Sequence, residues 1–271
     1  MEKKKLASAL AILGLGLIGT VYAIATIAVM RGDGRISFTY RAPFSPQDIM
    51  MLAIQVCSVV LCIIGIIMLS GLKSDMPAVS RKVTKTQRLV ESGILLALGF
   101  VLSIIKVRLV AGGGSITMVS MLPIVILAFK YGPSWGALCG FVHGLLQVLE
   151  GGGIAPPTRD FMSFAAVFIL DYALAWAAVG LIAGFVCKFL SNPQISIALG
   201  ALLGIAGRYL CSTVSGMVIW SVWMPEGENV FLWSLGVNGI VMIPEMLITT
   251  VAGFAVLAIP VIRMNVSRSH I

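Results

Sequence analysis

The feature that most constrains this 271-residue chain is a series of apolar runs that are too long for the core of a soluble domain. A helix that crosses a bilayer needs about 20 apolar residues, because its backbone groups must find their hydrogen bonds within the segment itself. Hydrophobic residues make up 59% of the chain and charged residues only 11%. Soluble domains carry about a quarter charged residues, so the composition predicts an all-α integral membrane protein.

The apolar runs predict eight membrane spans in two groups. The first two form an N-terminal transmembrane hairpin at 1–72, for which a cleaved signal peptide is the weaker alternative because its first run is long. A basic linker at 73–88 separates this hairpin from a six-helix membrane domain at 89–260. The six spans of that domain are predicted at 89–110, 116–130, 133–150, 160–186, 194–219 and 231–259.

The basic residues indicate how the chain is oriented. They concentrate in the linker and near both ends of the chain, so the excess of cytoplasmic Lys and Arg predicts that both termini, including the tail at 261–271, are cytoplasmic. The predicted location is the cell membrane, crossed several times. The net charge of +8 is spread between apolar runs and forms no single patch, which argues against a nucleic-acid partner.

Four ionisable residues fall inside predicted spans, where a charge is costly and marks a site or an internal pair. Asp171 lies about ten residues into its span, which is near the middle of the bilayer at about 1.5 Å per residue. Its carboxylate is interpreted as the counter-charge of a cationic ligand, and the alternative is a structural ion pair with Arg208. Glu245 is expected to be structural, and His143 to be a hydrogen-bonded histidine of the core.

A second set of residues indicates where a ligand would lie. Ser212, Gly216 and Trp220 are spaced by four, which places them on one face of a helix. Gly216 is expected to leave space beside the indole for a flat ring, and Asn238 offers both a donor and an acceptor. A carboxylate such as that of Asp171 beside indole rings suits a delocalised organic cation, because ion pairing and cation–π attraction add together.

Small residues at every fourth position mark faces for close helix packing. Gly136, Gly140 and Gly144 form the clearest such face, and packing within the bundle is the favoured interpretation. Gly93 and Ala97 form a shorter one near the start of the first span of the six-helix domain. For this pair, packing within the chain and docking of another subunit remain open alternatives.

Several short motifs follow one another in order along 113–245. They are Gly113-Gly114-Ser115-Ile116-Thr117, Ser120-Met121-Leu122-Pro123, Leu170-Asp171-Tyr172-Ala173, Arg208-Tyr209-Leu210-Cys211, Ser215-Gly216, Asn238-Gly239 and Pro244-Glu245. Over about 89–260 this ordered set resembles the ThiT-type S components, the thiamine-binding subunits of energy-coupling-factor (ECF) transporters.

The resemblance implies a substrate-binding subunit with its pocket toward the outside. A transmembrane coupling subunit and two cytoplasmic ATPases would be its partners and would supply the ATP hydrolysis. The ligand would be thiamine or a related pyrimidine or thiazole compound. The resemblance assigns ligand-binding positions to Asp171, Tyr172, Ser212, Gly216, Trp220, Trp233, Asn238 and Ser115, and positions that dock the coupling subunit to Gly93 and Ala97.

Three positions depart from the family pattern. Ser212 stands where the family usually has His, Trp233 stands where it usually has Tyr, and Asp171 is one methylene shorter than the Glu of some members. The first two changes remove hydrogen-bonding groups, and such groups discriminate strongly between ligands.

Two other functions are the alternatives to a binding subunit. A stand-alone secondary transporter would predict a repeat between halves of the chain, and none is visible. An integral membrane enzyme would use Asp171 or His143, but the spans hold few other polar groups. The sequence contains no catalytic constellation, metal-ligand cluster or Walker A motif, so neither an enzymatic activity nor a cofactor is predicted.

Overall fold

The structure is a computed structural model. It describes residues 83–108, 115–117, 119–150, 156–157 and 160–258, together with the isolated positions 8, 11, 12 and 15. The predicted hairpin at 1–72, most of the linker at 73–88 and the tail at 261–271 lie outside the described residues.

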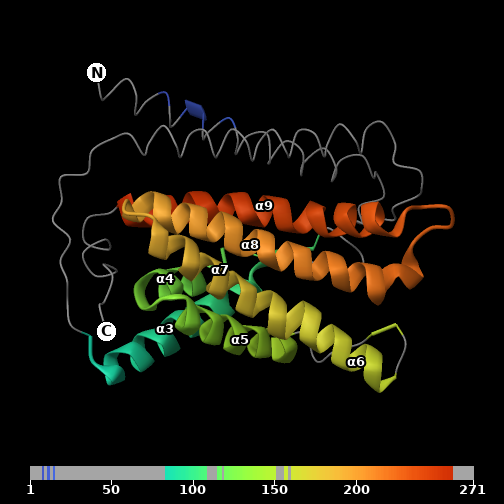
Figure 1. Cartoon of the computed structure of the whole chain (residues 1–271), viewed down its shortest axis with the longest axis horizontal. Helices are drawn as coiled ribbons and strands as arrows, with labels where there is room; N and C mark the ends of the chain where they lie inside the picture. The colour runs from blue at the N-terminus through green and yellow to red at the C-terminus, as the bar shows by residue number, and fades with distance from the viewer. Residues whose placement is uncertain are drawn as a thin grey trace.

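Long helices dominate the described part of the chain, and a small two-stranded sheet follows the first of them (Figure 1). The elements in chain order are α3 (Lys85–Ile104), β1 (Lys106–Arg108), β2 (Ser115–Thr117), α4 (Leu122–Tyr131), α5 (Pro133–Glu150), α6 (Phe161–Val167), η1 (Phe168–Leu174), α7 (Ala175–Phe189), α8 (Pro193–Val218), η2 (Trp220–Trp223) and α9 (Val230–Ala258). Here η1 is a π-helix that joins α6 to α7, and η2 is a 3₁₀ turn.

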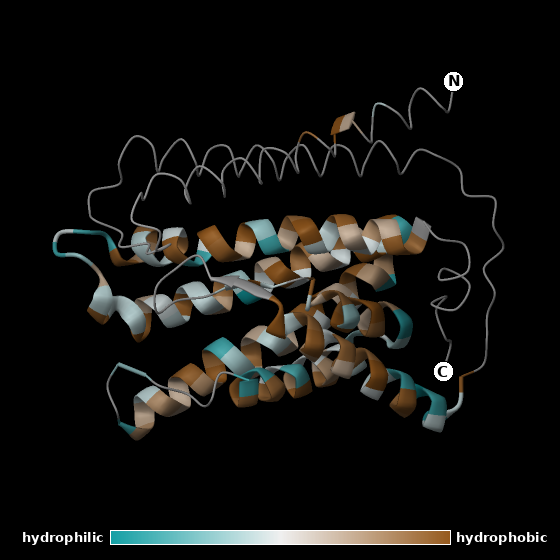
Figure 2. Ribbon diagram, turned by 180° about the vertical axis from the view of Figure 1, so that it is seen from behind, coloured by the Kyte–Doolittle hydropathy of each residue, from teal (hydrophilic) through white to brown (hydrophobic). Residues whose placement is uncertain are grey.

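Four helical segments of the described chain are long and apolar enough to cross a membrane. They are Lys85–Ile104, Phe161–Phe189, Pro193–Val218 and Val230–Leu257, while Leu122–Tyr131 is a shorter apolar helix. Hydrophilic residues gather at α3's first turn and in the loop between η2 and α9 (Figure 2). The prediction of a mostly helical, multi-pass membrane protein is therefore confirmed.

The sequence-based boundaries are wrong at two places. Helix α3 begins at Lys85, inside the linker predicted at 73–88. The span expected at 89–110 ends as a helix at Ile104, and the helix expected from 116 begins only at Leu122. Between them, β1 and β2 pair antiparallel, with Val107 opposite Ile116. β-Branched residues favour a strand here, and the intervening glycines disfavour a helix.

Local signals explain where the helices begin. The Thr84 hydroxyl accepts a hydrogen bond from the backbone N–H of Gln87, whose side chain accepts one from the Thr84 N–H, so α3 starts with a capping box. Asp160 caps α6, and Asn192 caps α8 ahead of Pro193.

The core lies between α4, α7, α8 and α9. Its fully buried side chains include Ile124, Val179, Ile197 and Ile205. In Figure 1, α8 and α9 run side by side over most of their length, and α5 lies against α7. These contacts hold π-helix η1, which packs on both α5 and α8, between its neighbours.

The glycine face of α5 packs against the segment that contains η1 and α7. A Cβ atom added to Gly136 would lie 2.6 Å from the carbonyl oxygen of Gly180, and one added to Gly140 would lie 2.1 Å from that of Trp176. At Gly144 the nearest atom is the carbonyl oxygen of Tyr172, at 2.4 Å. The predicted packing within the bundle is confirmed, and it brings α5 directly against the turn that carries Asp171 and Tyr172.

A substitution at this face tests the packing. Gly140→Ala is expected to lower the free energy of unfolding by about 1–3 kcal/mol, because its methyl group meets rigid backbone. Gly93→Ala is the matched control: no atom lies within 4 Å of a Cβ at that position, so a gain of up to about 1 kcal/mol in helix propensity is expected. Thermal unfolding in detergent measures both, and equal midpoints for the two variants would contradict the contact.

Candidate functional site

The candidate site is organised by the π-helix η1. This seven-residue segment, Phe168–Leu174, contains Asp171 and Tyr172 and is continuous with α6 before it and α7 after it. π-Helices are rare and occur often at functional sites, because the widened turn displaces side chains from the regular α-helical register. The sequence predicts a regular helix over 160–186, so this element is a finding of the structure.

The Asp171 carboxylate accepts two hydrogen bonds on one oxygen. Ser215 Oγ donates to Oδ2 over 2.7 Å, and Trp220 Nε1 donates to the same atom over 3.0 Å. Trp220 Nε1 also lies 3.2 Å from Ser215 Oγ, so the three side chains form one group, here called the Asp171 cluster. Within the described residues Oδ1 of Asp171 has no hydrogen-bond partner, which leaves one oxygen for a ligand.

Ser215 is the member of this cluster that was not predicted from the sequence as a site residue. Its hydroxyl is fully buried in the last turns of α8, and it joins Asp171 on η1 to Trp220 on η2. The only hint in the sequence that Ser215 belongs to the site was its hydroxyl, which lies five residues before Trp220 in an otherwise apolar helix. The spacing did not show that it faces Asp171.

The two tryptophans of η2 have different environments. The Trp220 ring lies 5.2 Å from that of Trp223, centroid to centroid, with the planes tilted by 41°. Trp223 is 57% exposed, as expected for an aromatic anchor at the membrane surface. Trp220 is instead drawn inward by its bond to Asp171.

No ion pair joins Asp171 to Arg208 in the described structure, although this pair was the structural alternative left open by the sequence. Arg208 Nη1 lies 3.8 Å from Oε2 of Glu245, which is almost completely buried. The Arg208 guanidinium also stacks over Trp176, with Cζ 3.9 Å from the ring centroid, and Nη1 is 3.3 Å from Sδ of Met121. Arg208 is therefore occupied elsewhere.

Glu245 is structural, as predicted, because it connects α9 to the sheet. Its Oε1 accepts a hydrogen bond from the hydroxyl of Thr117 in β2, while its Oε2 faces Arg208. Ser120 contacts the same hydroxyl over 2.6 Å. The buried pair of Arg208 and Glu245 thus fixes strand β2 relative to α8 and α9.

Ser212, Gly216 and Asn238 lie at the contact between α8 and α9. Asn238 Nδ2 donates to the carbonyl oxygen of Ser212 over 3.2 Å and to that of Ser234 over 2.9 Å. A Cβ added to Gly216 would lie 2.0 Å from Ser234 Oγ, so this glycine admits α9. The space that Gly216 was predicted to leave for a flat ring is instead filled by Ser234 and Asn238 of α9.

The remaining predicted site residues lie on three different elements. Tyr172 is on η1, next to Asp171, and Trp233 is 7% exposed in the first turn of α9. Ser115 lies in β2, opposite Arg108. Among the described residues these three make no hydrogen bond to the Asp171 cluster, and positions 112–114, which precede Ser115, lie outside the described residues.

His143 is a core histidine, as predicted. It is fully buried, its Nε2 lies 3.3 Å from Nε2 of Gln147, and its ring is 4.6 Å from that of Trp176. Gln147 in turn donates to Ser103 Oγ over 2.8 Å. These contacts tie α3, α5 and α7 together.

Gly93 and Ala97 lie on the exposed side of α3. The buried residues of this helix are Ser92, Gly99 and Ser103, whereas Ile94 is 64% exposed. No atom of the described chain lies within 4 Å of a Cβ added to Gly93. This face is apolar, carries small residues, and is open in the described structure.

Comparison with known proteins gives consistent matches. The family described as "Thiamine transporter protein (Thia_YuaJ)" matches residues 89–265. The chain is 28% identical over 174 residues to the thiamine transporter ThiT of Bacillus subtilis, covering 60% of this chain and 86% of that protein. It is 29% identical over 131 residues to the thiamine transporter ThiT of Lacticaseibacillus paracasei, covering 44% and 61% respectively.

A solved structure shows the same fold. The structure of ThiT from Listeria monocytogenes superposes with a TM-score of 0.54 and 21% sequence identity, covering 64% of this chain and 94% of the other. At this level of identity the likeness concerns the fold.

Proposed function

The chain belongs to the thiamine transporter family, and from this premise we propose that it is the thiamine-binding S component of an ATP-driven ECF importer. It is a transport protein and not an enzyme, as the family shows. ATP hydrolysis and the movement that releases the vitamin would belong to a coupling subunit and two cytoplasmic ATPases.

One observation supports the assignment of the ligand site: the intramembrane carboxylate of Asp171 forms no ion pair with a described residue. A charge at this depth is costly unless it is compensated. Ser215 and Trp220 hold one oxygen in place, and the other is available to a ligand. The permanently positive thiazolium ring of thiamine supplies the missing charge, and the Trp220 indole adds cation–π attraction of about 1–2 kcal/mol in a desolvated site.

The Asp171 cluster is the proposed centre of the site, and we propose that the other assigned residues line the site around it. Tyr172 is adjacent on η1, and Trp233 and Asn238 belong to the first turns of the facing helix α9. Ser212 and Gly216 contribute by letting α9 pack closely on α8. Ser115 begins strand β2, which Glu245 holds through the hydroxyl of Thr117. From this strand, Ser115 is proposed to contact the bound vitamin.

The binding experiment is a titration of the purified full chain with thiamine, followed by tryptophan fluorescence. A saturable change with a dissociation constant of about 1 μM or tighter is expected, equivalent to at least about 8 kcal/mol of binding free energy. Because Ser212 and Trp233 depart from the family pattern, the pyrimidine and thiazole moieties and the thiamine phosphates belong in the same panel. A flat signal with every compound would overturn the proposed ligand class.

The exposed face of α3 is the proposed docking site for the coupling subunit. Ala97→Trp is expected to reduce recovery of a co-expressed coupling subunit about tenfold or more, a loss of about 1.4 kcal/mol, because the indole prevents close helix approach. Thiamine binding should be unchanged, since Ala97 lies on the exposed side of α3 and the new side chain points away from the bundle. Leu181→Trp, at a 40% exposed position of α7, is the matched control. Equal recovery with both variants would exclude this face.

A further inference from the structure

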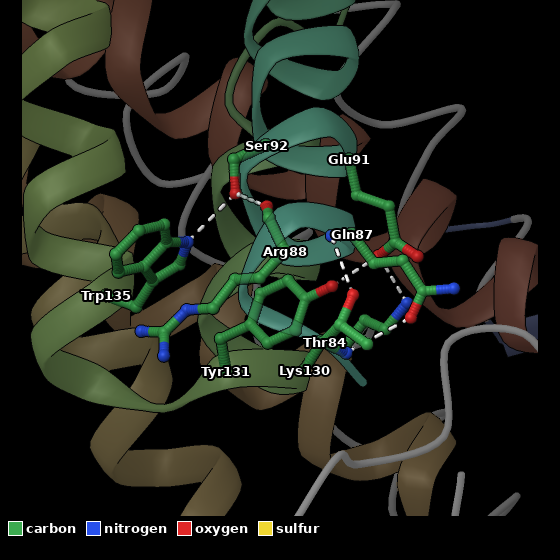
Figure 3. A network of polar contacts seen from close by, with 8 residues as sticks. All are labelled: Thr84, Gln87, Arg88, Glu91, Ser92, Lys130, Tyr131 and Trp135. Carbon is green, nitrogen blue, oxygen red and sulfur yellow. Dashed lines mark hydrogen bonds and ion pairs between the residues drawn. The ribbon is translucent and has the colours of Figure 1, made fainter. Parts of the chain in front are cut away.

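Arg88 occupies an unusual position in the first turn of α3. Its guanidinium carbon lies 3.6 Å from the ring centroid of Trp135 on α5 and 5.3 Å from that of Tyr131 at the end of α4. Figure 3 shows the side chain extended on the Trp135 side of α3, with the carboxylate of Glu91 on the opposite side. The cation therefore contacts the ring of Trp135 and lies near that of Tyr131.

The aromatic platform is itself fixed by hydrogen bonds. Trp135 Nε1 donates to Ser92 Oγ over 2.9 Å, and the same hydroxyl donates to the carbonyl oxygen of Arg88 over 2.7 Å. The Tyr131 hydroxyl donates to Glu91 (Figure 3). Arg88 thus lies on rings whose orientation is already set.

The charge of Arg88 is not neutralised by any described residue. Glu91, the acidic residue one turn later, instead binds Lys130 and Tyr131. Arg88 Nε is buried and has no hydrogen-bond partner in the described structure, and no ion pair reaches the guanidinium there. A planar cation with unused donors is suited to an anion that accepts two parallel hydrogen bonds, such as a phosphate.

The position of Arg88 along the helix places it at the membrane surface. It is the fourth residue of the span Lys85–Ile104, so it lies about 5 Å from the helix start at about 1.5 Å per residue. Trp135 and Tyr131 are at the adjoining ends of α5 and α4, and Trp and Tyr typically lie at the level of lipid headgroups. Further along α5 the surface is apolar, with Leu138 48% exposed.

The sequence before α3 is rich in basic residues. Between positions 73 and 88 it contains Lys73, Arg81, Lys82, Lys85 and Arg88 and a single acidic residue, Asp75. Basic clusters directly next to a transmembrane helix are typical of segments that attract anionic lipids.

We propose that Arg88, held on Trp135 and Tyr131, binds the headgroup phosphate of an anionic phospholipid at the end of the bundle where α3 begins. The acyl chains would run along the apolar surface beside Leu138.

A lipid is favoured over a carboxylate of a partner protein by the geometry of α3. At about 100° per residue, Arg88 lies about 180° around the helix from Ala97 and about 140° from Gly93. The face proposed for the coupling subunit therefore points away from Arg88. The lipid site is independent of the proposed thiamine site, so either can fail without the other.

The test measures the lipid that stays bound to the purified full chain. Protein from vesicles of equal phosphatidylglycerol and phosphatidylcholine is washed in detergent with about 1 M salt, where the screening length of about 3 Å removes diffusely attracted lipid. The wild type is expected to retain phosphatidylglycerol in preference, and Arg88→Gln to retain about fivefold less. Arg88→Lys should be intermediate, because it keeps the charge but loses the planar stacking. Lys188→Gln, at an exposed position in the last turn of α7, should match the wild type.

Three results would overturn the proposal. The first is equal retention of phosphatidylglycerol by the wild type and Arg88→Gln when both have the same unfolding midpoint in phosphatidylcholine. The second is displacement of the lipid by millimolar glycerol phosphate, which would identify a free phosphate as the ligand. The third is loss of the coupling subunit from Arg88→Gln with lipid retention unchanged, which would identify a protein carboxylate. Failure of glycerol phosphate to compete supports the lipid.

Discussion

Asp171→Asn is expected to weaken thiamine binding at least about 30-fold, because the bound cation loses its counter-charge in a water-poor site. Removing one partner of a desolvated charge pair costs about 2–5 kcal/mol of binding free energy. The folded structure should survive, since the asparagine side-chain oxygen can still accept from Ser215 and Trp220, as Oδ2 of the carboxylate does. The measurement is the titration of tryptophan fluorescence, with the unfolding midpoint determined on the same sample.

Two further measurements separate a role in binding from a role in folding. Ser215→Ala removes one donor that orients the carboxylate, and it should cost only about 1 kcal/mol, or about fivefold in affinity. A neutral pyrimidine compound should bind Asp171→Asn and the wild type about equally, because it brings no charge to the site. If Asp171→Asn binds thiamine like the wild type, or loses the cation and the neutral compound in the same proportion, Asp171 is not the counter-charge.

Arg208→Gln is expected to lower the free energy of unfolding by about 3–5 kcal/mol. The substitution leaves Glu245 charged and almost completely buried, with only the Thr117 hydroxyl still bonded to it. It also removes the cation stacked on Trp176 and the contact with Met121. The effect on stability should exceed that of any other single substitution discussed for this chain.

A double-mutant cycle identifies the pair as the cause. Arg208→Gln/Glu245→Gln should recover at least about 1 kcal/mol of the loss, because no unpaired charge remains in the buried site. Lys188→Gln, an exposed basic position, is the control and should change stability by less than about 0.5 kcal/mol. Additive losses in the double variant would show that the two side chains act independently, in spite of the 3.8 Å separation of Nη1 and Oε2.

The buried pair also bears on how the site is assembled. Glu245 holds Thr117, and Thr117 ends the strand that contains Ser115. Arg208 of α8 and Glu245 of α9 thus connect these two helices to strand β2. Ser215, which is also in α8, holds Asp171. Helix α8 therefore carries both the structural charge pair and the support of the proposed ligand carboxylate.

The membrane class and the helical architecture followed from the sequence, because apolar runs of bilayer length have few other stable conformations. The ordered motifs indicated the family, which the match over 89–265 confirms. The π-helix could not be predicted, since one extra residue in a turn leaves the hydrophobic pattern almost unchanged. The short strands were missed because Val107 and Ile116 are as apolar as the spans beside them.

Only the tertiary structure decided which partner each intramembrane charge takes. Asp171 and Arg208 are one acid and one base at similar depth, so the sequence left their pairing open, but the packing of α9 on α8 brings Glu245 to Arg208 and leaves Asp171 to Ser215 and Trp220. The helix faces with small residues likewise were visible in the sequence, whereas what they contact was decided by the tertiary structure. Gly140 and Gly93 belong to similar patterns, yet one meets a backbone oxygen at 2.1 Å and the other meets no atom within 4 Å. Spacing along one helix shows which residues share a face, and only the position of the neighbouring helix shows what that face contacts.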